Sequence, residues 1–403
     1  MTTTRNGTTR RWLGAAAIAA LGWAATLSGA NAAGVDLGMF TSLTGASAVV
    51  GQDMQRGAQL AVDQINAGYA VPMKDGSTVK LGPGLLGGPV TLSVEDSQSD
   101  PKAAMDAVRK LVEVDKVPVV LGEYSSGLTL PTGQYTNKNK IVQISIGANS
   151  PMLRDIGPYF FDMIALNNVE GPPMVDIAVR DLKAKTFATM VPNNPYGVGL
   201  EQALCDAAKT SGGSCAVSVR YESNQTDYRA QLQQIAGANP DAVFFFAYGS
   251  DATLLLKQAS ELGMTPGKNW FGPEMSNWSN EVTANPDIAK IADGIRGIDF
   301  SVGGNFYDKT YAAPFKAKFG ADPATDFGGF AYDATMVAAL AINAANSADP
   351  TAIQKQVINM ANKYKGVTGD KSMDKDGMQV NATLVDEIYK DGKLQPYTPG
   401  SGG

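Results

Sequence analysis

The segment V-P-V-V-L-G-E-Y-S-S-G-L-T-L-P, Val117 to Pro131, decides the fold of this chain. It opens with a run of β-branched and aliphatic residues, which is typical of a strand buried on both faces. A glycine-flanked turn follows, and then a segment with helical spacing. A buried strand that leads through a glycine loop into a helix is the repeating unit of a parallel sheet covered by helices.

This unit recurs along most of the chain. The run A-V-F-F-F at 242–246 predicts another strand buried on both faces, and Gly51 to Asn66 places Met54, Ala58 and Val62 on one helical face. The alternation predicts an α/β protein with parallel sheets that carry helices on both faces. Further helices are predicted at Leu128 to Asn137, Tyr307 to Phe319 and Phe330 to Ala345.

The length of 403 residues exceeds what one hydrophobic core usually holds, so two domains are expected. Two sets of strand–helix units are separated by the aromatic segment P-Y-F-F-D-M-I, Pro158 to Ile164. The helices predicted after residue 306 need a partner sheet. If they return to the first set, the chain crosses between lobes more than once, and several crossings form a hinge.

The first residues have the pattern of an export signal. Met1 to Arg11 carries three arginines and no acid, Trp12 to Leu27 is apolar, and Ala30-Asn31-Ala32 has the small-x-small pattern of a cleavage site. We predict a signal peptide over residues 1–33. A retained membrane anchor is the alternative, but its apolar run is shorter than the roughly 20 residues that a spanning helix needs.

Composition excludes several classes of function. Removal of residues 1–33 changes the formal net charge from −6 to −9, because that segment holds three arginines and no acids. An acidic exported protein without a basic stripe is not expected to bind nucleic acid. The chain has no histidine, which removes the usual activator of a serine nucleophile. We predict no cofactor and no metal.

The chain has two cysteines, Cys205 and Cys215. Their spacing of ten residues suits one disulfide in an oxidising compartment. Two free buried thiols are the alternative.

Ser125 and Ser126 raise the question of whether one is a nucleophile or whether the loop holds an anion. If Ser126 caps a helix that begins near Gly127, its hydroxyl and the free N–H groups of the first turn point into the same space. That arrangement suits a carboxylate. A plain helix cap that binds nothing is the alternative.

Three further loops follow predicted strands, where ligands bind in open α/β sheets. Gly147, Ala148 and Asn149 offer backbone and amide groups, although this is also an ordinary turn sequence. Tyr248 follows the A-V-F-F-F strand and offers both a ring and a hydroxyl, or else it is a core aromatic. Glu274 stands among bulky apolar residues, where a carboxylate needs a partner, unless it is a solvated loop glutamate.

An anion cradle in one half and a carboxylate in the other fit the two charges of an amino-acid zwitterion. A hydrolase that uses the paired carboxylates Glu95 and Asp96 is disfavoured, because adjacent residues on a strand point to opposite faces and cannot flank one bond. The sequence therefore predicts a binding protein and not an enzyme.

The order of motifs resembles the branched-chain amino-acid-binding receptors of bacterial ABC transporters. The matching motifs, which extend over nearly the whole mature chain, are F-T-S-L-T-G, G-Q-D-M-Q-R-G-A-Q-L-A-V-D-Q-I-N, V-E-D-S-Q-S-D-P-K-A-A, the S-S loop, G-A-N-S-P, N-P-Y-G-V-G, L-K-Q-A and G-P-E. The resemblance implies two Rossmann-like lobes joined by three hinge crossovers, with the ligand held in the cleft between them. It places lobe I at 34–166 and 301–381, and lobe II at 167–300 and 382–403.

The resemblance also implies roles for particular residues. Ser126, Ala148, Asn149 and Glu274 would hold the backbone groups of the amino acid. Tyr196 and Tyr248 would lie against the ligand.

The expected protein is a monomeric periplasmic receptor that delivers a neutral or branched-chain amino acid to a membrane permease. The chain departs from such receptors at two positions: Asn149 stands where they usually have a small hydroxyl residue, and Val50 stands where an aromatic ring commonly covers the side chain of the ligand. The segment Tyr69 to Gly88 is also longer than expected. An amide, a urea-like solute or an aromatic acid is the alternative ligand.

Overall fold

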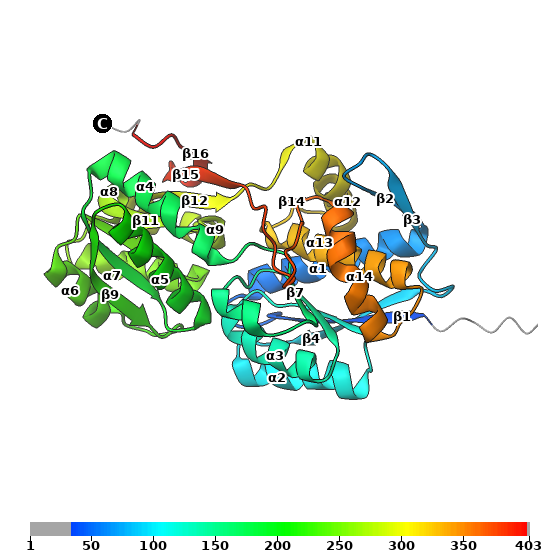
Figure 1. Cartoon of the computed structure of the whole chain (residues 1–403). Helices are drawn as coiled ribbons and strands as arrows, with labels where there is room; N and C mark the ends of the chain where they lie inside the picture. The colour runs from blue at the N-terminus through cyan, green and yellow to red at the C-terminus, as the bar shows by residue number, and fades with distance from the viewer. Residues whose placement is uncertain (1–33, 401–403) are drawn as a thin grey trace, which may run out of the picture.

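The computed structural model describes residues 34–400 and contains two large sheets flanked by helices (Figure 1). The first sheet has the order β4-β1-β5-β6-β7, and its neighbouring strands are parallel. Its strands are β1 (Val35–Thr41), β4 (Val90–Asp96), β5 (Val119–Leu121), β6 (Val142–Ser145) and β7 (Phe160–Asp162). The chain reverses its direction of winding between β1 and β5, which makes the ends of these strands a topological switch point.

The second sheet has the order β16-β15-β12-β11-β10-β8-β9. Its parallel part consists of β8 (Thr186–Pro192), β9 (Ser214–Tyr221), β10 (Ala242–Phe245), β11 (Trp270–Gly272) and β12 (Arg296–Phe300). The hairpin β15 (Leu384–Lys390) and β16 (Lys393–Pro396) adds antiparallel to one edge. The switch point of this sheet lies between β8 and β10.

We call the first sheet and its helices lobe I, and the second sheet and its helices lobe II. Lobe I contains α1 (Ala48–Ala67), α2 (Pro101–Arg109), η1 (Lys110–Val114), α3 (Ser126–Lys138), η2 (Pro151–Asp155), α11 (Gly304–Tyr307), η4 (Asp308–Ala312), α12 (Ala313–Phe319), α13 (Phe327–Ala345) and α14 (Pro350–Lys363). Lobe II contains η3 (Asn167–Val169), α4 (Gly171–Leu182), α5 (Pro195–Thr210), α6 (Arg229–Ala238), α7 (Gly249–Glu261), α8 (Pro266–Asn269), α9 (Ser276–Thr283) and α10 (Pro286–Ala292).

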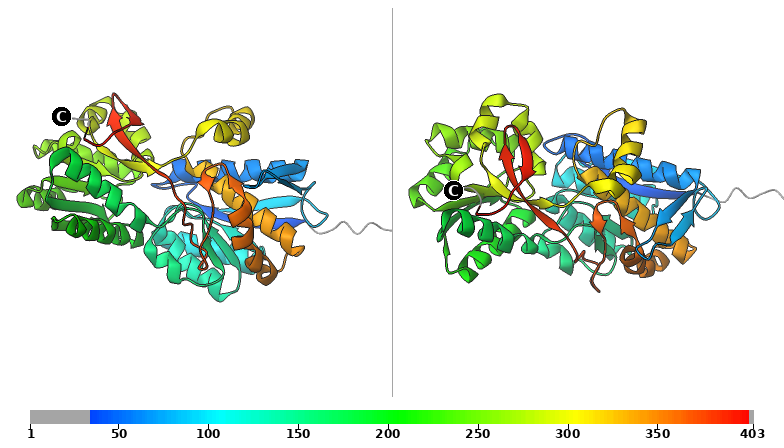
Figure 2. Two further views of the ribbon diagram at one scale, coloured as in Figure 1. Left: turned by 45° about the horizontal axis from the view of Figure 1, so that its top comes forward. Right: turned by 90° about the horizontal axis from the view of Figure 1, so that it is seen from above.

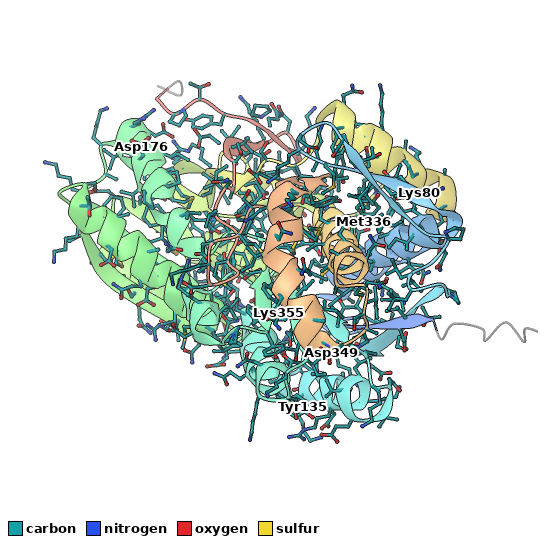
Figure 3. The ribbon with its side chains drawn as sticks, turned by 45° about the vertical axis from the view of Figure 1, so that its right-hand side comes forward. Lys80, Tyr135, Asp176, Met336, Asp349 and Lys355 are labelled. Carbon is teal, nitrogen blue, oxygen red and sulfur yellow. A yellow bond between two sulfur atoms is a disulfide. The ribbon has the colours of Figure 1, made fainter. Side chains whose placement is uncertain are left out.

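Helix α13 lies in the hydrophobic core of lobe I, and its residues from Phe327 to Ile342 are all buried. Met336, labelled in Figure 3, has an exposed fraction of 0%. Against α1, the helix backbones come so close that a Cβ on Gly57 would stand 1.9 Å from the carbonyl oxygen of Gly328. Glycine permits this close approach, which brings a helix from late in the chain onto the first helix of lobe I.

The chain passes between the lobes three times: between β7 and α4, between β12 and α11, and between the small hairpin β13 (Lys365–Gly366) and β14 (Gly369–Asp370) and β15. The two lobes lie side by side with these segments between them (Figure 2). The prediction of an α/β protein with two Rossmann-like lobes is confirmed.

The predicted helix from Tyr307 to Phe319 is confirmed, with one π-helical turn inside it. It consists of α11, the π-helical turn η4 and α12 in unbroken succession, and the residues at both junctions keep right-handed helical dihedrals. Pro314, which lacks an N–H, lies just after the π-helical turn.

The long segment Tyr69 to Gly88 forms the hairpin β2 (Tyr69–Pro72) and β3 (Thr78–Leu81) on lobe I. The N–H of Lys74 donates to the carbonyl of Lys363 at 2.8 Å, and its ammonium pairs with Asp370. The hairpin therefore contacts the end of α14 through Lys363 and the strand β14, which precedes the last crossing, through Asp370.

A disulfide joins Cys205 on α5 to Cys215 on β9, with the Cα atoms 5.5 Å apart. Among residues 34–400, no helix combines the length and apolarity needed to cross a bilayer. The predicted signal peptide, residues 1–33, lies outside the described part of the chain.

Candidate functional site

The loops at both switch points face one space between the lobes. A cavity of about 270 Å³ lies there. Lobe I contributes Ser47 after β1 and Ser125 after β5, and lobe II contributes Asn194 after β8 and Tyr248 after β10. This is the position at which open α/β sheets bind ligands.

Ser126 lies at this switch point in lobe I, but it does not cap α3 as the sequence interpretation expected. The helix begins at Ser126, so the capping position is Ser125. The Oγ of Ser126 instead accepts the backbone N–H groups of Asn149 and Ser150, at 3.2 and 3.1 Å. Ser126, with an exposed fraction of 1%, thereby ties the loop after β5 to the loop after β6.

Glu123 is a buried carboxyl beside the start of α3 that sequence reasoning missed. It accepts hydrogen bonds from the hydroxyls of Ser42 and Ser97 at 2.6 and 2.7 Å, and from the N–H of Ser125 at 2.9 Å. Burial raises its pKa. The N–H of Ser125, the residue before α3, is thus already bound by an acid of the chain itself.

Asn149 joins the two lobes. Its Nδ2 donates to Glu274 Oε1 at 2.8 Å and to Glu170 Oε1 at 3.0 Å. Its Oδ1 is buried with no hydrogen-bond partner within residues 34–400. Ser126 and Glu274 therefore belong to one continuous network, in which Asn149 is the link.

Glu274 is not a solvated loop glutamate, because its exposed fraction is 3%. Its backbone has a φ of 46°, a left-handed conformation that is uncommon for residues other than glycine. Oε2 accepts from Asn277 Nδ2 at 2.7 Å. Burial raises the pKa of Glu274 to about 7.

Glu170 is a second carboxyl at the same place, and sequence reasoning missed it. It immediately precedes α4, and its exposed fraction is 0%. Burial raises its pKa well above its usual range, and the charge of Glu274 raises it further. A search for polar residues that follow predicted strands could not find Glu170, because Glu170 precedes a helix after an irregular crossing between the lobes.

Aromatic rings line the neighbourhood of these acids. Tyr196 in the first turn of α5 packs on Phe246 with the ring centroids 4.4 Å apart, and Tyr248 meets Tyr124 at 5.8 Å. The Tyr248 hydroxyl accepts from Asn194 Nδ2 at 3.1 Å, whereas the Tyr196 hydroxyl has no partner in the described part of the chain. Such rings offer an apolar surface and a polar tip to a small ligand.

Gly147, Ala148 and Val50, the remaining predicted positions, are buried in lobe I and do not line the cavity of about 270 Å³. The N–H of Gly147 donates to the carbonyl of Glu123 at 3.1 Å. A Cβ on Gly147 would stand 2.7 Å from the ring of Phe327, so only glycine fits there. Ala148 and Val50 are buried, with exposed fractions of 0% and 6%.

The structure brings Ser126, Asn149 and Glu274 into one hydrogen-bonded network. Burial is the main cause of the raised pKa values of Tyr196 and Tyr248, and the charge of Glu274 raises both further. This geometry places acidic groups and phenolic rings of lobe II opposite a helix N-terminus of lobe I.

Two lobes with three crossings and a polar site between their switch points define a class of solute-binding proteins. A family model described as "Periplasmic binding protein" matches residues 34–393. The chain belongs to this family.

Individual relatives cover almost all of the chain. The leucine-, isoleucine-, valine-, threonine- and alanine-binding protein of Pseudomonas aeruginosa is 28% identical over 384 residues, which is 93% of this chain and 95% of that protein. A branched-chain amino-acid transporter substrate-binding protein from Streptococcus pneumoniae, solved with isoleucine, is 25% identical with a TM-score of 0.75, and the match covers 90% of this chain and 98% of that one.

A solute-binding protein of an ABC transporter from R. palustris, solved with benzoate, shares the fold. It is 19% identical with a TM-score of 0.73, over 90% of this chain and 95% of that one. Proteins of this fold therefore take ligands with and without an amino group, so the ligand of each has to be argued from its own side chains.

Proposed function

We propose that this chain is an extracytoplasmic solute-binding receptor of an ABC importer and that it binds a neutral amino acid of the branched-chain type. The observation that carries the proposal is the hydrogen bond from Asn149 of lobe I to the buried carboxyl of Glu274 in lobe II. An ionised carboxylate buried between the lobes is costly without a cationic partner, and the ammonium group of an amino acid supplies one.

The ligand would be held at both ends. Glu274 would accept its ammonium, and the hydroxyl of Ser126 with the first N–H groups of α3 would receive its carboxylate. Gly147, Ala148 and Asn149 would border the same end, and Tyr196 and Tyr248 would cover the ligand from lobe II. The P. aeruginosa and S. pneumoniae proteins, which their names and bound ligand connect with branched-chain amino acids, support this assignment.

The cleft would open and close by a hinge at the three crossings. We propose the domain limits 34–166 and 301–381 for lobe I, and 167–300 and 382–403 for lobe II. The receptor would act as a monomer in the periplasm, reached by the predicted signal at 1–33, and would deliver its ligand to a membrane permease. It would have no catalytic role and no nucleic-acid partner.

A ligand without an amino group is the second candidate, as in the R. palustris protein solved with benzoate. Glu274 argues against it, because an aromatic acid would bring a second carboxylate toward a buried acid and no cation to pair with it. Amides and urea-like solutes lack the charge that Glu274 needs.

A thermal-shift screen of the purified chain tests the proposal. The ligands are the common amino acids, short amides and benzoates. A true ligand at 100 times its Kd should add about 2.7 kcal/mol to the free energy of unfolding. Leucine, isoleucine or valine should raise the melting temperature, and a shift with benzoates alone would reject the amino-acid assignment.

A further inference from the structure

Glu170 is a buried acid that charge balance in the proposed site does not require. A neutral amino acid brings one ammonium group, and Glu274 by itself can pair with it. Glu170 nevertheless has an exposed fraction of 0%, and its Oε2 has no hydrogen-bond partner within residues 34–400. A buried acceptor without a donor is costly, so it needs a physical explanation.

Glu170 and Glu274 are held together by lobe II. Glu170 immediately precedes α4, Glu274 follows β11, and α4 packs against both β11 and β12. Asn149 Nδ2 donates to one oxygen of each acid, so these two oxygens lie within two hydrogen-bond lengths of each other. The two carboxyls are also within hydrogen-bonding reach of each other.

Two ionised carboxylates at this spacing would repel each other strongly. One proton on the pair removes the repulsion, and it converts a contact between two acceptors into an O–H···O hydrogen bond. The same proton gives the unpartnered oxygen of Glu170 a function. Geometry thus favours a pair that carries a single negative charge.

The surroundings assign the proton to Glu170. Glu274 accepts amide N–H groups from both Asn149 and Asn277, which stabilise its charged form. Glu170 accepts from Asn149 alone among the described residues, and its pKa is raised well above its usual range, chiefly by burial.

The other titratable groups facing the pair add no positive charge. Asp299 on β12 is acidic and raises the pKa of both carboxyls. The phenols of Tyr124 and Tyr248 come from the loops after β5 and β10, that of Tyr196 comes from the first turn of α5, and burial raises the pKa of each. A neutral Glu170 therefore fits its environment better than a charged one.

We propose that Glu170 is a positioning residue that works as a neutral carboxylic acid: its O–H donates to the carboxylate of Glu274 and orients that carboxylate toward the ammonium group of the ligand. The inference rests on the proposed amino-acid site. Because the pair then carries one negative charge, it matches one ammonium group. The proton remains on Glu170 throughout binding and release.

Two substitutions separate a neutral donor from a charged acid. Glu170→Gln replaces the O–H with an N–H donor of similar shape and removes the ability to ionise. Glu170→Ala removes the donor. Glu201→Gln, which alters an ion pair with Arg220 at the surface of lobe II, is the matched control.

Affinity for leucine is measured by calorimetry from about pH 6 to about pH 8, across the pKa of Glu274. Glu170→Gln and the control should bind within about threefold of the wild type and follow its pH profile. Glu170→Ala should lose about tenfold or more, because the hydrogen bond to a charged group is gone. An equal loss in the Gln and Ala variants, or no loss in either, would overturn the inference.

A second measurement does not depend on ligand binding. Infrared spectra of the wild-type protein at neutral pH should contain the carbonyl band of buried protonated carboxyl groups, to which Asp162 also contributes. A difference spectrum should show that Glu170→Gln weakens this band. An unchanged band in the variant, or absence of the band in the wild type, would also overturn the inference. Failure of the wild type to bind any amino acid would instead reject the proposed function.

Discussion

Replacement of Glu274 by glutamine removes the charge that the proposed function assigns to the ammonium group and leaves the shape of the side chain. The carboxyl has an exposed fraction of 3% and accepts amide N–H groups from Asn149 and Asn277. Both amides have an Oδ1 with no partner within residues 34–400. Either amide can therefore rotate to accept from the new NH₂ group, so we expect Glu274→Gln to fold.

The expected loss follows from the kind of interaction removed. A hydrogen bond to a charged group contributes about 1.5 to 3 kcal/mol, and the low dielectric of a closed cleft keeps the value toward the upper part of that range. Affinity for leucine should therefore fall by about 10-fold to 150-fold.

Isothermal titration calorimetry at neutral pH measures this loss, and thermal denaturation without ligand checks the fold. Glu261→Gln is the control, because it removes a carboxylate that pairs with Arg229 on the surface of the same lobe. The control should bind like the wild type. An affinity of Glu274→Gln within about threefold of the wild type would refute the zwitterion site.

Three other outcomes follow from the structure. Binding should weaken as the pH falls below about 7, because Glu274 must be ionised to hold an ammonium group and its pKa is raised to about 7. Calorimetry over a pH series measures whether affinity falls in acid, and stronger binding in acid would contradict the prediction. Replacing Cys205 and Cys215 by serine should lower the free energy of unfolding by about 2 to 3 kcal/mol in urea titrations while leaving affinity unchanged. Gly57→Ala should cost about 1 to 3 kcal/mol in the same assay, because the added Cβ meets the carbonyl oxygen of Gly328 at 1.9 Å; no change would mean that α1 and α13 can separate freely.

The sequence predicted the local elements well, because the period of apolar residues is a local property. Val119–Leu121 is a buried strand, and α3 follows it as the opening segment indicated. The same reasoning placed the capping position one residue late. The N–H of Ser125 is bound by the carboxyl of Glu123, and that contact is not visible in the spacing of the residues.

The candidate site was only partly predictable. Glu274 could be selected because a carboxylate among apolar residues needs a partner, and Asn149 because it follows a strand. Glu170 has no comparable signal, because it precedes a helix after a crossing. Glu123 follows the strand β5 just as Asn149 follows β6, but its serine partners come from distant loops and are not visible in the sequence.

The sequence by itself determined the alternation of strands and helices, the α/β class, and the loops at which polar groups gather, because hydrophobic period and turn chemistry act over a few residues. Only the tertiary structure decided which polar groups meet. Asn149 reaches Glu274 across 125 positions of the chain, and Glu170 joins them through the packing of α4 on the second sheet. The protonation of such a pair depends on burial and on the distance between charges, and both exist only once the two lobes are folded and brought together.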